Sequence, residues 1–271
     1  MRLAHALAAL ALLAAPAAAQ DRIPSHCIAL AEATPGMEYL HKAAWGDPLP
    51  ADWVRINYVG HATFAIETPG GLVAATDFTG DLGTTEVVPD VVTMNHAHTT
   101  HWTPSPDPRI PHVLRGWGAG YGDAAEHHLD LGEMLVRNVP TDIRSFGGVE
   151  ENGNSIFVFE VAGLCVGHLG HLHHEPEPAQ YAAIGRLDVV MAPVDGSMTL
   201  DLPAMIRTLK RFRASVVIPM HWFGDRTLEA FLDGMADDFD VVRTEESHLD
   251  LSLTNLPARP TVMVLRPRPL R

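Results

Sequence analysis

The sequence has few basic residues, few cysteines and no long apolar run beyond its first 20 residues. Its 271 residues include 19 Lys and Arg against 33 Asp and Glu, for a formal net charge of −14. Proteins that bind the phosphate backbone need clustered Lys and Arg, so we expect no nucleic-acid partner. No segment after residue 20 approaches the roughly 18 apolar residues of a membrane span, so we expect a soluble mature chain. The sequence does not indicate an oligomeric state.

The two cysteines, Cys27 and Cys165, leave two interpretations open. An oxidising compartment would permit a disulfide between them. Cys165, however, lies in an apolar run typical of a strand, so we favour a buried thiol there and keep the disulfide as the alternative. Neither cysteine has the surroundings of a nucleophile.

The N-terminus has the pattern of a secretory signal peptide. Arg2 leads into an apolar stretch from Leu3 to Ala15, and small residues at 17–19 offer a cleavage site. We therefore predict a signal peptide at 1–19 and a periplasmic or secreted protein. An uncleaved N-terminal anchor is the alternative. An irregular segment at 20–50 follows, and 51–271 is long enough for one large domain.

The remainder of the chain divides into a strand-rich half and a half in which helices alternate with strands. Short apolar or β-branched runs bounded by Gly, Pro and Asp predict strands: WVRINYVG, ATFAIET, LVAATD, DVVTMN, EMLVRNVP, SIFVFEV and LCVGHL. Beyond about Glu177, helices are predicted at AQYAAIGRL, LDLPAMIRTLKRF and RTLEAFLDGMADD, before the strands DVVMAPV, SVVIPM and FDVVRT. This order favours an α/β layered sandwich.

Histidine is abundant, and it gathers where predicted strands end. The sequence VVTMNHAHTTHW places three histidines within six residues after an apolar run, and LCVGHLGHLHHE and SVVIPMHW repeat the arrangement. Three strand ends can converge at one edge of a layered sheet. Imidazole suits zinc, iron, nickel or copper, so the pattern predicts a metal site. The candidates are His96, His98, His101, His168, His171, His173, His174 and His221.

From about Trp53 to about Asp225 the sequence resembles the metallo-β-lactamase superfamily, and more narrowly the branch with L-ascorbate-6-phosphate lactonase and related metal-dependent hydrolases. GHATFAIET resembles that branch's opening hairpin, AATDF its strand ending in aspartate, and DVVTMNHAHTTH its strand followed by the motif HxHxDH. The resemblance implies a four-layer αββα sandwich over 51–271, with the metal site at one edge. It also implies that His96, His98, His101 and His221 bind metal.

Three positions depart from the family pattern. Thr100 stands at the motif aspartate, and His171 stands where relatives carry an aspartate that bridges two metals. Ile143 lies near a further expected histidine, unless a shift in the alignment brings Asp142 there. A neutral hydroxyl cannot replace a carboxylate at a dication, and one imidazole cannot bridge two ions. We therefore expect one metal held by three or four of His96, His98, His101, His171 and His221. His168, His173 or His174 would be recruited if a second metal bound.

Carboxylates near the site are candidates to hold the ligating rings. Asp77, at the end of a predicted strand, is the main one, and for Asp195 a role in a turn is the preferred interpretation. His61 is equally compatible with the pocket and with structural packing, while His127 and His128 fit a solvated loop.

The metal is most readily zinc, with copper or iron as alternatives. A metal that lowers the pKa of a bound water toward about 7 would make the protein a hydrolase of an ester, lactone, amide or phosphodiester in a small molecule. The alternative is a non-hydrolytic periplasmic metal-binding or redox protein on the same fold, since an all-histidine site also suits copper or iron.

Overall fold

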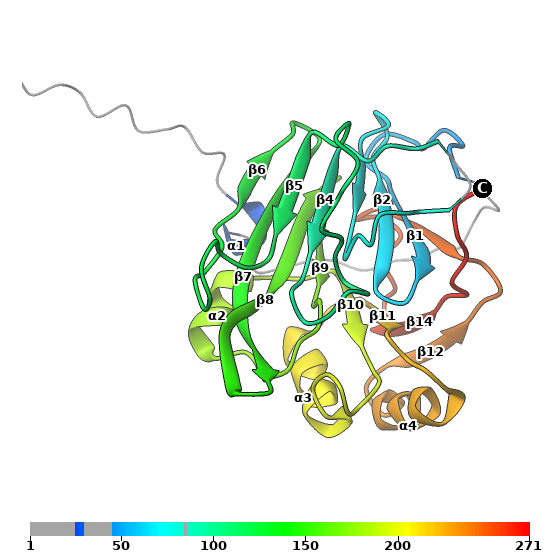
Figure 1. Cartoon of the computed structure of the whole chain (residues 1–271). Coiled ribbons are helices and arrows are strands. Elements are labelled where there is room, and N and C mark those ends of the chain that lie inside the picture. The colour runs from blue at the N-terminus through cyan, green and yellow to red at the C-terminus, as the bar shows by residue number, and fades with distance from the viewer. Residues whose placement is uncertain (1–24, 30–44, 84–85) are drawn as a thin grey trace, which may run out of the picture.

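The computed structural model describes residues 25–29, 45–83 and 86–271. Two β-sheets pack face to face, and three helices lie against the outer face of the larger sheet (Figure 1). The predicted α/β layered sandwich is confirmed. The predicted signal peptide at 1–19 lies outside the described residues. No helix in the described ranges is both long and apolar enough to cross a membrane.

The smaller sheet has six strands. Their spatial order is β13 (His248–Leu251), β1 (Val54–Gly60), β2 (Thr63–Glu67), β3 (Val73–Ala75), β4 (Val91–Met94) and β5 (His112–Arg115). The pairs β13–β1, β1–β2 and β2–β3 are antiparallel, whereas β3–β4 and β4–β5 are parallel. The first four predicted strands are therefore all present in this sheet.

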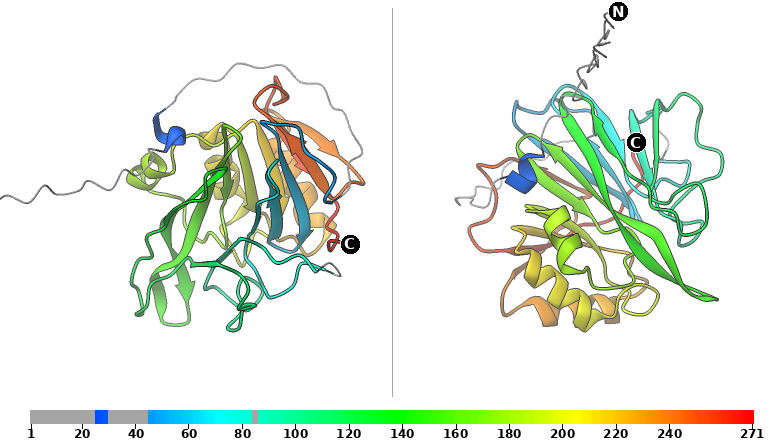
Figure 2. Two further views of the ribbon diagram at one scale, coloured as in Figure 1. Left: turned by 90° about the horizontal axis from the view of Figure 1, so that it is seen from above. Right: turned by 90° about the vertical axis from the view of Figure 1, so that its left-hand side faces the viewer.

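The larger sheet has eight strands. Their order is β12 (Asp240–Arg243), β14 (Thr261–Val264), β11 (Val216–Met220), β10 (Val189–Pro193), β9 (Leu164–His168), β8 (Gly148–Val161), β7 (Met134–Ser145) and β6 (His128–Asp130). β7 and β8 form a long hairpin that extends beyond the neighbouring strands (Figure 2). β9, β10 and β11 are parallel to one another, so their carboxyl ends meet at one edge of the sheet. His128, predicted in a loop, instead begins β6.

Three helices cover the outer face of the larger sheet: α2 (Pro178–Ile184), α3 (Leu202–Phe212) and α4 (Asp225–Met235). α3 begins where the Asp201 side chain accepts a hydrogen bond from the Ala204 amide, and it ends at Arg213, whose backbone is left-handed. Met205 and Leu209, four residues apart and so on one face of α3, are fully buried against the sheet. The three helices predicted in the second half of the chain are therefore all present.

The outer face of the smaller sheet carries no helix among the described residues. Side chains from irregular segments cover it, and they include Phe78, Ile110, Trp102, Trp117 and Leu270. The αββα expectation thus holds for two sheets and one helical layer, while loops form the fourth layer.

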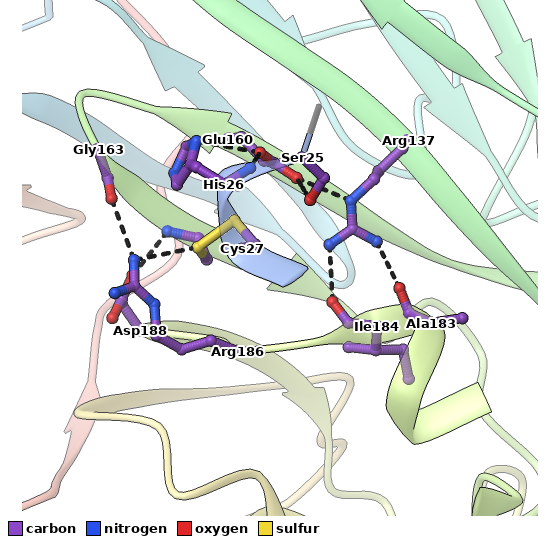
Figure 3. Close-up of a disulfide and its surroundings, with 11 residues drawn as sticks. Ser25, His26, Cys27, Arg137, Glu160, Gly163, Ala183, Ile184, Arg186 and Asp188 are labelled. Atoms are coloured by element: carbon purple, nitrogen blue, oxygen red, sulfur yellow. Dashed lines mark hydrogen bonds and ion pairs between the residues drawn. A yellow bond between two sulfur atoms is a disulfide. The ribbon is translucent and has the colours of Figure 1, made fainter. Parts of the chain in front are cut away.

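The N-terminal helix α1 (His26–Ala29) is covalently attached to the larger sheet, because Cys27 and Cys165 form a disulfide (Figure 3). The buried thiol favoured from the sequence is therefore wrong, and the alternative is correct. Cys165 does lie in an apolar strand, but α1 packs directly over it. Beside the bond, Glu160 accepts hydrogen bonds from the Ser25 hydroxyl and the His26 amide (Figure 3).

Candidate metal centre

Three strand ends bring four histidines together at one edge of the sandwich. β4 of the smaller sheet leads into His98 and His101, while β9 and β11 of the larger sheet lead into His171 and His221. One ring nitrogen from each of the four lies within 4.8 Å of the others. The site is thus assembled from both sheets, as the three histidine-containing strand ends predict.

Local backbone conformation aims these side chains. His221 and His61 have φ angles of 55° and 51°, and Asp77 has 40°, a region that costs energy for any residue other than glycine. Gly170 has φ of 59°, and a Cβ there would lie 2.3 Å from Asn95 Nδ2. The turn between His168 and His171 therefore requires glycine. Strain concentrated at one point of a fold is typical of a functional site.

In all four histidines a neighbouring polar group lies within 3.0 Å of Nδ1, which leaves Nε2 to face the cluster. His101 Nδ1 lies 2.5 Å from Asp77 Oδ2, and His221 Nδ1 lies 3.0 Å from Asp195 Oδ2. His98 Nδ1 lies 2.8 Å from Thr100 Oγ1, and His171 Nδ1 lies 2.6 Å from His173 Nε2. Metal-ligating histidines are held in this way, by a second group on the other ring nitrogen.

The carboxylates behind these rings are themselves anchored. Asp77 is fully buried and accepts a hydrogen bond from Asn95 Nδ2. Asp195 accepts hydrogen bonds from the amides of Ser197 and Met198 and from the Thr199 hydroxyl. Asp195 therefore has the role in the turn preferred from the sequence and also contacts His221. Asp77 stands where it was predicted, behind a candidate ligand.

The titration of the site favours neutral rings and charged carboxylates at neutral pH. Burial lowers the pKa of His98 to about 4 and that of His101 to about 3, and it also lowers the pKa of His171. Burial raises the pKa of Asp77 to about 6. Burial acts in the same direction on Asp195, but hydrogen bonds from His221 and Thr199 outweigh it and hold that pKa below its usual range. Imidazole must be neutral to bind a metal.

Two buried nitrogen atoms indicate that the cluster suits a cation. Nε2 of His101 and Nε2 of His221 have no hydrogen-bond partner within the part of the chain that the structure describes. Both side chains are completely buried, and an unpaired buried polar atom is costly unless an ion or water occupies the site. Four imidazole nitrogens aimed at one point, with two buried carboxylates behind them, therefore fit a divalent metal ion.

His96, predicted as a ligand, lies apart from this cluster. Its Nδ1 is 2.8 Å from Glu150 Oε1, and its ring stacks on Trp117 at 4.9 Å between centroids. Together with residues 118–123, these side chains line a separate cavity of about 250 Å³. Glu150 draws the ring away from the other histidines, and nothing in the sequence near residue 96 signals that partner.

The other candidates occupy structural positions or the rim of the cluster. Both ring nitrogens of His168 are engaged, by the Ala62 carbonyl and the Gly170 amide. His174 is outside the group of converging nitrogens, and His127 contacts the Arg115 carbonyl. The His61 ring packs 4.1 Å from that of His221, and its Nε2 lies 2.9 Å from Thr100 Oγ1. His61 thus faces the site.

A buried apolar side chain, Ile143, lies near the position at which the family pattern predicts a further histidine. Ile143 is 4 % exposed and faces Gly153 across the β7–β8 hairpin, where any side chain on Gly153 would meet it. Asp142, the alternative from a shifted alignment, instead accepts a hydrogen bond from the Asn152 amide. Neither residue reaches the cluster, so the structure supports the loss of a ligand here.

A family model described as "Beta-lactamase superfamily domain" matches residues 55–221, more than half of the chain. The chain belongs to this superfamily. The matched region begins in β1 and ends at His221, so it contains all four clustered histidines. Membership of the L-ascorbate-6-phosphate lactonase branch remains a prediction.

Superfamily relatives match along most of their own length. A UPF0173 metal-dependent hydrolase of Salinibacter ruber is 26% identical over 211 residues, which span 68% of this chain and 92% of that protein. The solved structure of a protein from Thermotoga maritima, assigned as a zinc-dependent hydrolase of the superfamily, has a TM-score of 0.56 at 27% identity and covers 78% of this chain and 98% of its own. Igni18, a metallo hydrolase of Ignicoccus hospitalis, has a TM-score of 0.53 at 20% identity, over 74% of this chain and 99% of its own, and so shares the fold.

Proposed function

We propose that this protein is a metal-dependent hydrolase that binds one divalent ion, most readily zinc, at the cluster of His98, His101, His171 and His221. The observation that carries the proposal is the convergence of four imidazole nitrogens, two of them buried without a partner. The names of the Salinibacter and Thermotoga relatives support the same reaction class. A bound divalent metal supplies a Lewis acid and activates water near neutral pH.

The residues around the cluster define what this chain contributes. Asp77 and Asp195 orient His101 and His221, and their negative charges offset the charge of a dication. Phe223 is 66% exposed, and its ring lies 5.2 Å from that of His221. The open side of the site therefore presents an aromatic surface, which suits a small organic substrate: an ester, lactone, amide or phosphodiester.

We also propose that the protein is exported to the periplasm or secreted. The disulfide between Cys27 and Cys165 supports this proposal, since such bonds form and persist in oxidising compartments. The N-terminal pattern of residues 1–19 points the same way.

The test combines metal analysis of protein purified from its native compartment with a panel of chromogenic esters, lactones, amides and phosphodiesters. We expect about one zinc ion per chain and hydrolysis of at least one class, lost with a chelator and restored by zinc. His101→Ala serves as the site control and should be inactive. A protein loaded with metal that hydrolyses nothing on the panel contradicts the proposal.

A second candidate, a redox or metal-carrying protein, is favoured by one observation: every converging donor is an imidazole nitrogen, a set that also suits copper or iron. Stoichiometric copper or iron together with electron transfer to an artificial acceptor would support this candidate and overturn the hydrolase.

A further inference from the structure

A backbone amide fixes the position of the proton on His173. The amide nitrogen of Arg144 donates a hydrogen bond to His173 Nδ1, at 2.5 Å. A peptide N–H can only donate, so Nδ1 must be the acceptor, and a neutral imidazole then carries its proton on Nε2. A doubly protonated imidazole has no acceptor nitrogen, so this hydrogen bond itself requires a neutral His173 ring.

The proton on His173 in turn determines the tautomer of His171. His173 Nε2 lies 2.6 Å from His171 Nδ1 and donates to it. His171 is 2% exposed, and because its Nδ1 accepts this hydrogen bond its ring is neutral as well. A neutral ring that accepts at Nδ1 carries its proton on Nε2. His171 therefore directs an N–H, and not a lone pair, toward the other three histidines.

In His98, His101 and His221 the ring proton has the opposite position, on Nδ1 and away from the centre of the cluster. Nδ1 of His101 is hydrogen-bonded to the carboxylate of Asp77, and Nδ1 of His221 lies 3.0 Å from a carboxylate oxygen of Asp195. Nδ1 of His98 faces the Thr100 hydroxyl, which can accept its proton and donate its own to His61 Nε2. Each of these three rings can therefore carry a lone pair on Nε2, and the Nε2 of His98 lies 2.9 Å from the Nε2 of His171, in position to accept its proton.

The reverse assignment for His171 would require two donors to face each other. If His171 bound a metal through Nε2, its Nδ1 proton would point at His173 Nε2, and the proton on His173 Nδ1 would point at the Arg144 amide. The backbone of residue 144 cannot readily move away, because the β7–β8 hairpin pairs Arg144 with Val149. The guanidinium of Arg144 also donates to the carbonyls of Ser197, Met198 and Thr199.

We propose that His98, His101 and His221 are the metal ligands, and that His171 is a catalytic residue whose Nε2–H binds a substrate oxygen beside the metal position. The His171 ring lies 4.7 Å from that of His101 and 4.8 Å from that of His221, and its Nε2 lies 2.9 Å from His98 Nε2, so its N–H points into the ligand set. An N–H in a buried site stabilises an oxygen that gains negative charge as an acyl or phosphoryl group reacts. This inference rests on the proposed hydrolase function and refines its ligand set.

The test compares the binding of Co²⁺ to His171→Ala, His171→Gln and His101→Ala, measured by visible absorption during titration of metal-free protein. We expect His171→Ala to bind Co²⁺ with a Kd within about threefold of the wild type, whereas His101→Ala should raise the Kd by more than about 100-fold. With zinc, kcat should fall by about 100-fold or more in His171→Ala, with little change in KM. His171→Gln retains an N–H donor and should recover part of that loss.

The outcomes separate this inference from the proposed function. If His171→Ala loses Co²⁺ as completely as His101→Ala does, His171 is a fourth ligand and the inference is overturned, while the metal site stands. If His101→Ala binds Co²⁺ like the wild type, the metal site itself is wrong and both proposals fail. His171→Gln provides the same comparison should His171→Ala fail to fold.

Discussion

Thr100 illustrates how a single residue can take a new role when a carboxylate is absent. The superfamily motif leads one to expect a metal-binding aspartate at this position, and the threonine cannot serve as one. Its hydroxyl instead lies between His98 Nδ1 and His61 Nε2, at 2.8 Å and 2.9 Å. A hydroxyl can accept from one ring and donate to the other, which a carboxylate cannot do. Thr100 therefore orients a proposed ligand, His98, and a residue at the rim of the site, His61.

Replacing Thr100 by valine should weaken metal binding. Valine has nearly the same shape but no hydroxyl, so His98 loses the group that holds its ring; we expect the zinc Kd to rise by about 10- to 100-fold. Thr100→Ser keeps the hydroxyl and should stay within about threefold of the wild type. Competition with a chromophoric zinc chelator measures both values. Equal affinities for the two variants would show that the hydroxyl has no such role.

Among the structural elements, the β7–β8 hairpin is connected to α1 and α2 through one buried ion pair. Arg137 of β7 donates to Glu160 of β8 at 2.8 Å and also to the carbonyls of Ala183 and Ile184 at the end of α2. Burial alone would raise the pKa of Glu160, but hydrogen bonds from Ser25 and Arg137 outweigh it, and the pKa is lowered. The folded protein therefore stabilises the ionised form.

Glu160→Gln should make the stability of the metal-free protein less sensitive to acid. A carboxyl whose pKa is lower in the folded state contributes stability above its unfolded pKa of about 4.5, and the contribution is lost as the pH falls through the folded pKa. Urea unfolding between about pH 6 and about pH 3 should therefore show a smaller loss for Glu160→Gln than for the wild type. Parallel curves for the two proteins would show that Glu160 is not preferentially ionised on folding. Both proteins contain the histidine cluster, so its titration contributes equally to both sets of unfolding free energies and leaves their difference unchanged.

The disulfide should be a major contribution to the attachment of α1. It closes a loop of 138 residues, so in the chain-entropy model its removal costs about 3 to 5 kcal/mol. The double variant Cys27→Ser, Cys165→Ser should unfold at a clearly lower guanidinium concentration than the wild type. A reducing agent should lower the midpoint of the wild type and leave that of the double variant unchanged. If the wild type without reducing agent and the double variant share one unfolding midpoint, the disulfide does not stabilise the fold.

At the scale of the whole molecule, the proposed metal centre lies between the two sheets. His98 and His101 follow a strand of the smaller sheet, while His171 and His221 follow strands of the larger one. Asn95 joins the same two sheets below the site, since its amide donates to Asp77 and its carbonyl accepts from the Ser155 amide. An ion bound here would therefore contact residues of both sheets, and its complete binding site exists only in the folded protein.

Zinc should consequently raise the unfolding temperature. At a free zinc concentration about 100 times the Kd, linkage gives about 2.7 kcal/mol, equivalent to about 5 to 10 °C for a domain of this size. Differential scanning calorimetry of metal-free protein with and without zinc measures the shift, and His101→Ala should abolish it. The same shift in both proteins would place the stabilising ion elsewhere.

The sequence was sufficient to predict the order of the elements and the edge at which histidines meet. Apolar runs ending at Met94, His168 and Met220 mark strands, and polar residues just beyond strand ends must lie at a sheet edge. The direction of a side chain after such an end depends on partners distant in sequence. His96 turns toward Glu150 for this reason, and His171 acquires its tautomer from the amide of residue 144.

The disulfide and the loop layer over the smaller sheet were not predicted for the same reason: both depend on contacts between residues that are distant in sequence. Cys27 bonds to a strand 138 positions away, and no local pattern indicates which thiols will meet. The loops over the smaller sheet replace a helical layer because tryptophans and other apolar side chains in them bury its outer face. Long-range contacts of this kind have no periodicity to detect.

The hydrogen bond from the Arg144 amide to His173 has a consequence for how the site tolerates mutation. Any residue except proline supplies a peptide N–H, so exchanging the arginine side chain leaves this donor in the chain. The proton order of the His173–His171 pair is therefore encoded by the path of the backbone and not by the identity of residue 144. Random substitution at this position should spare that order in nearly every case, and proline alone should erase it.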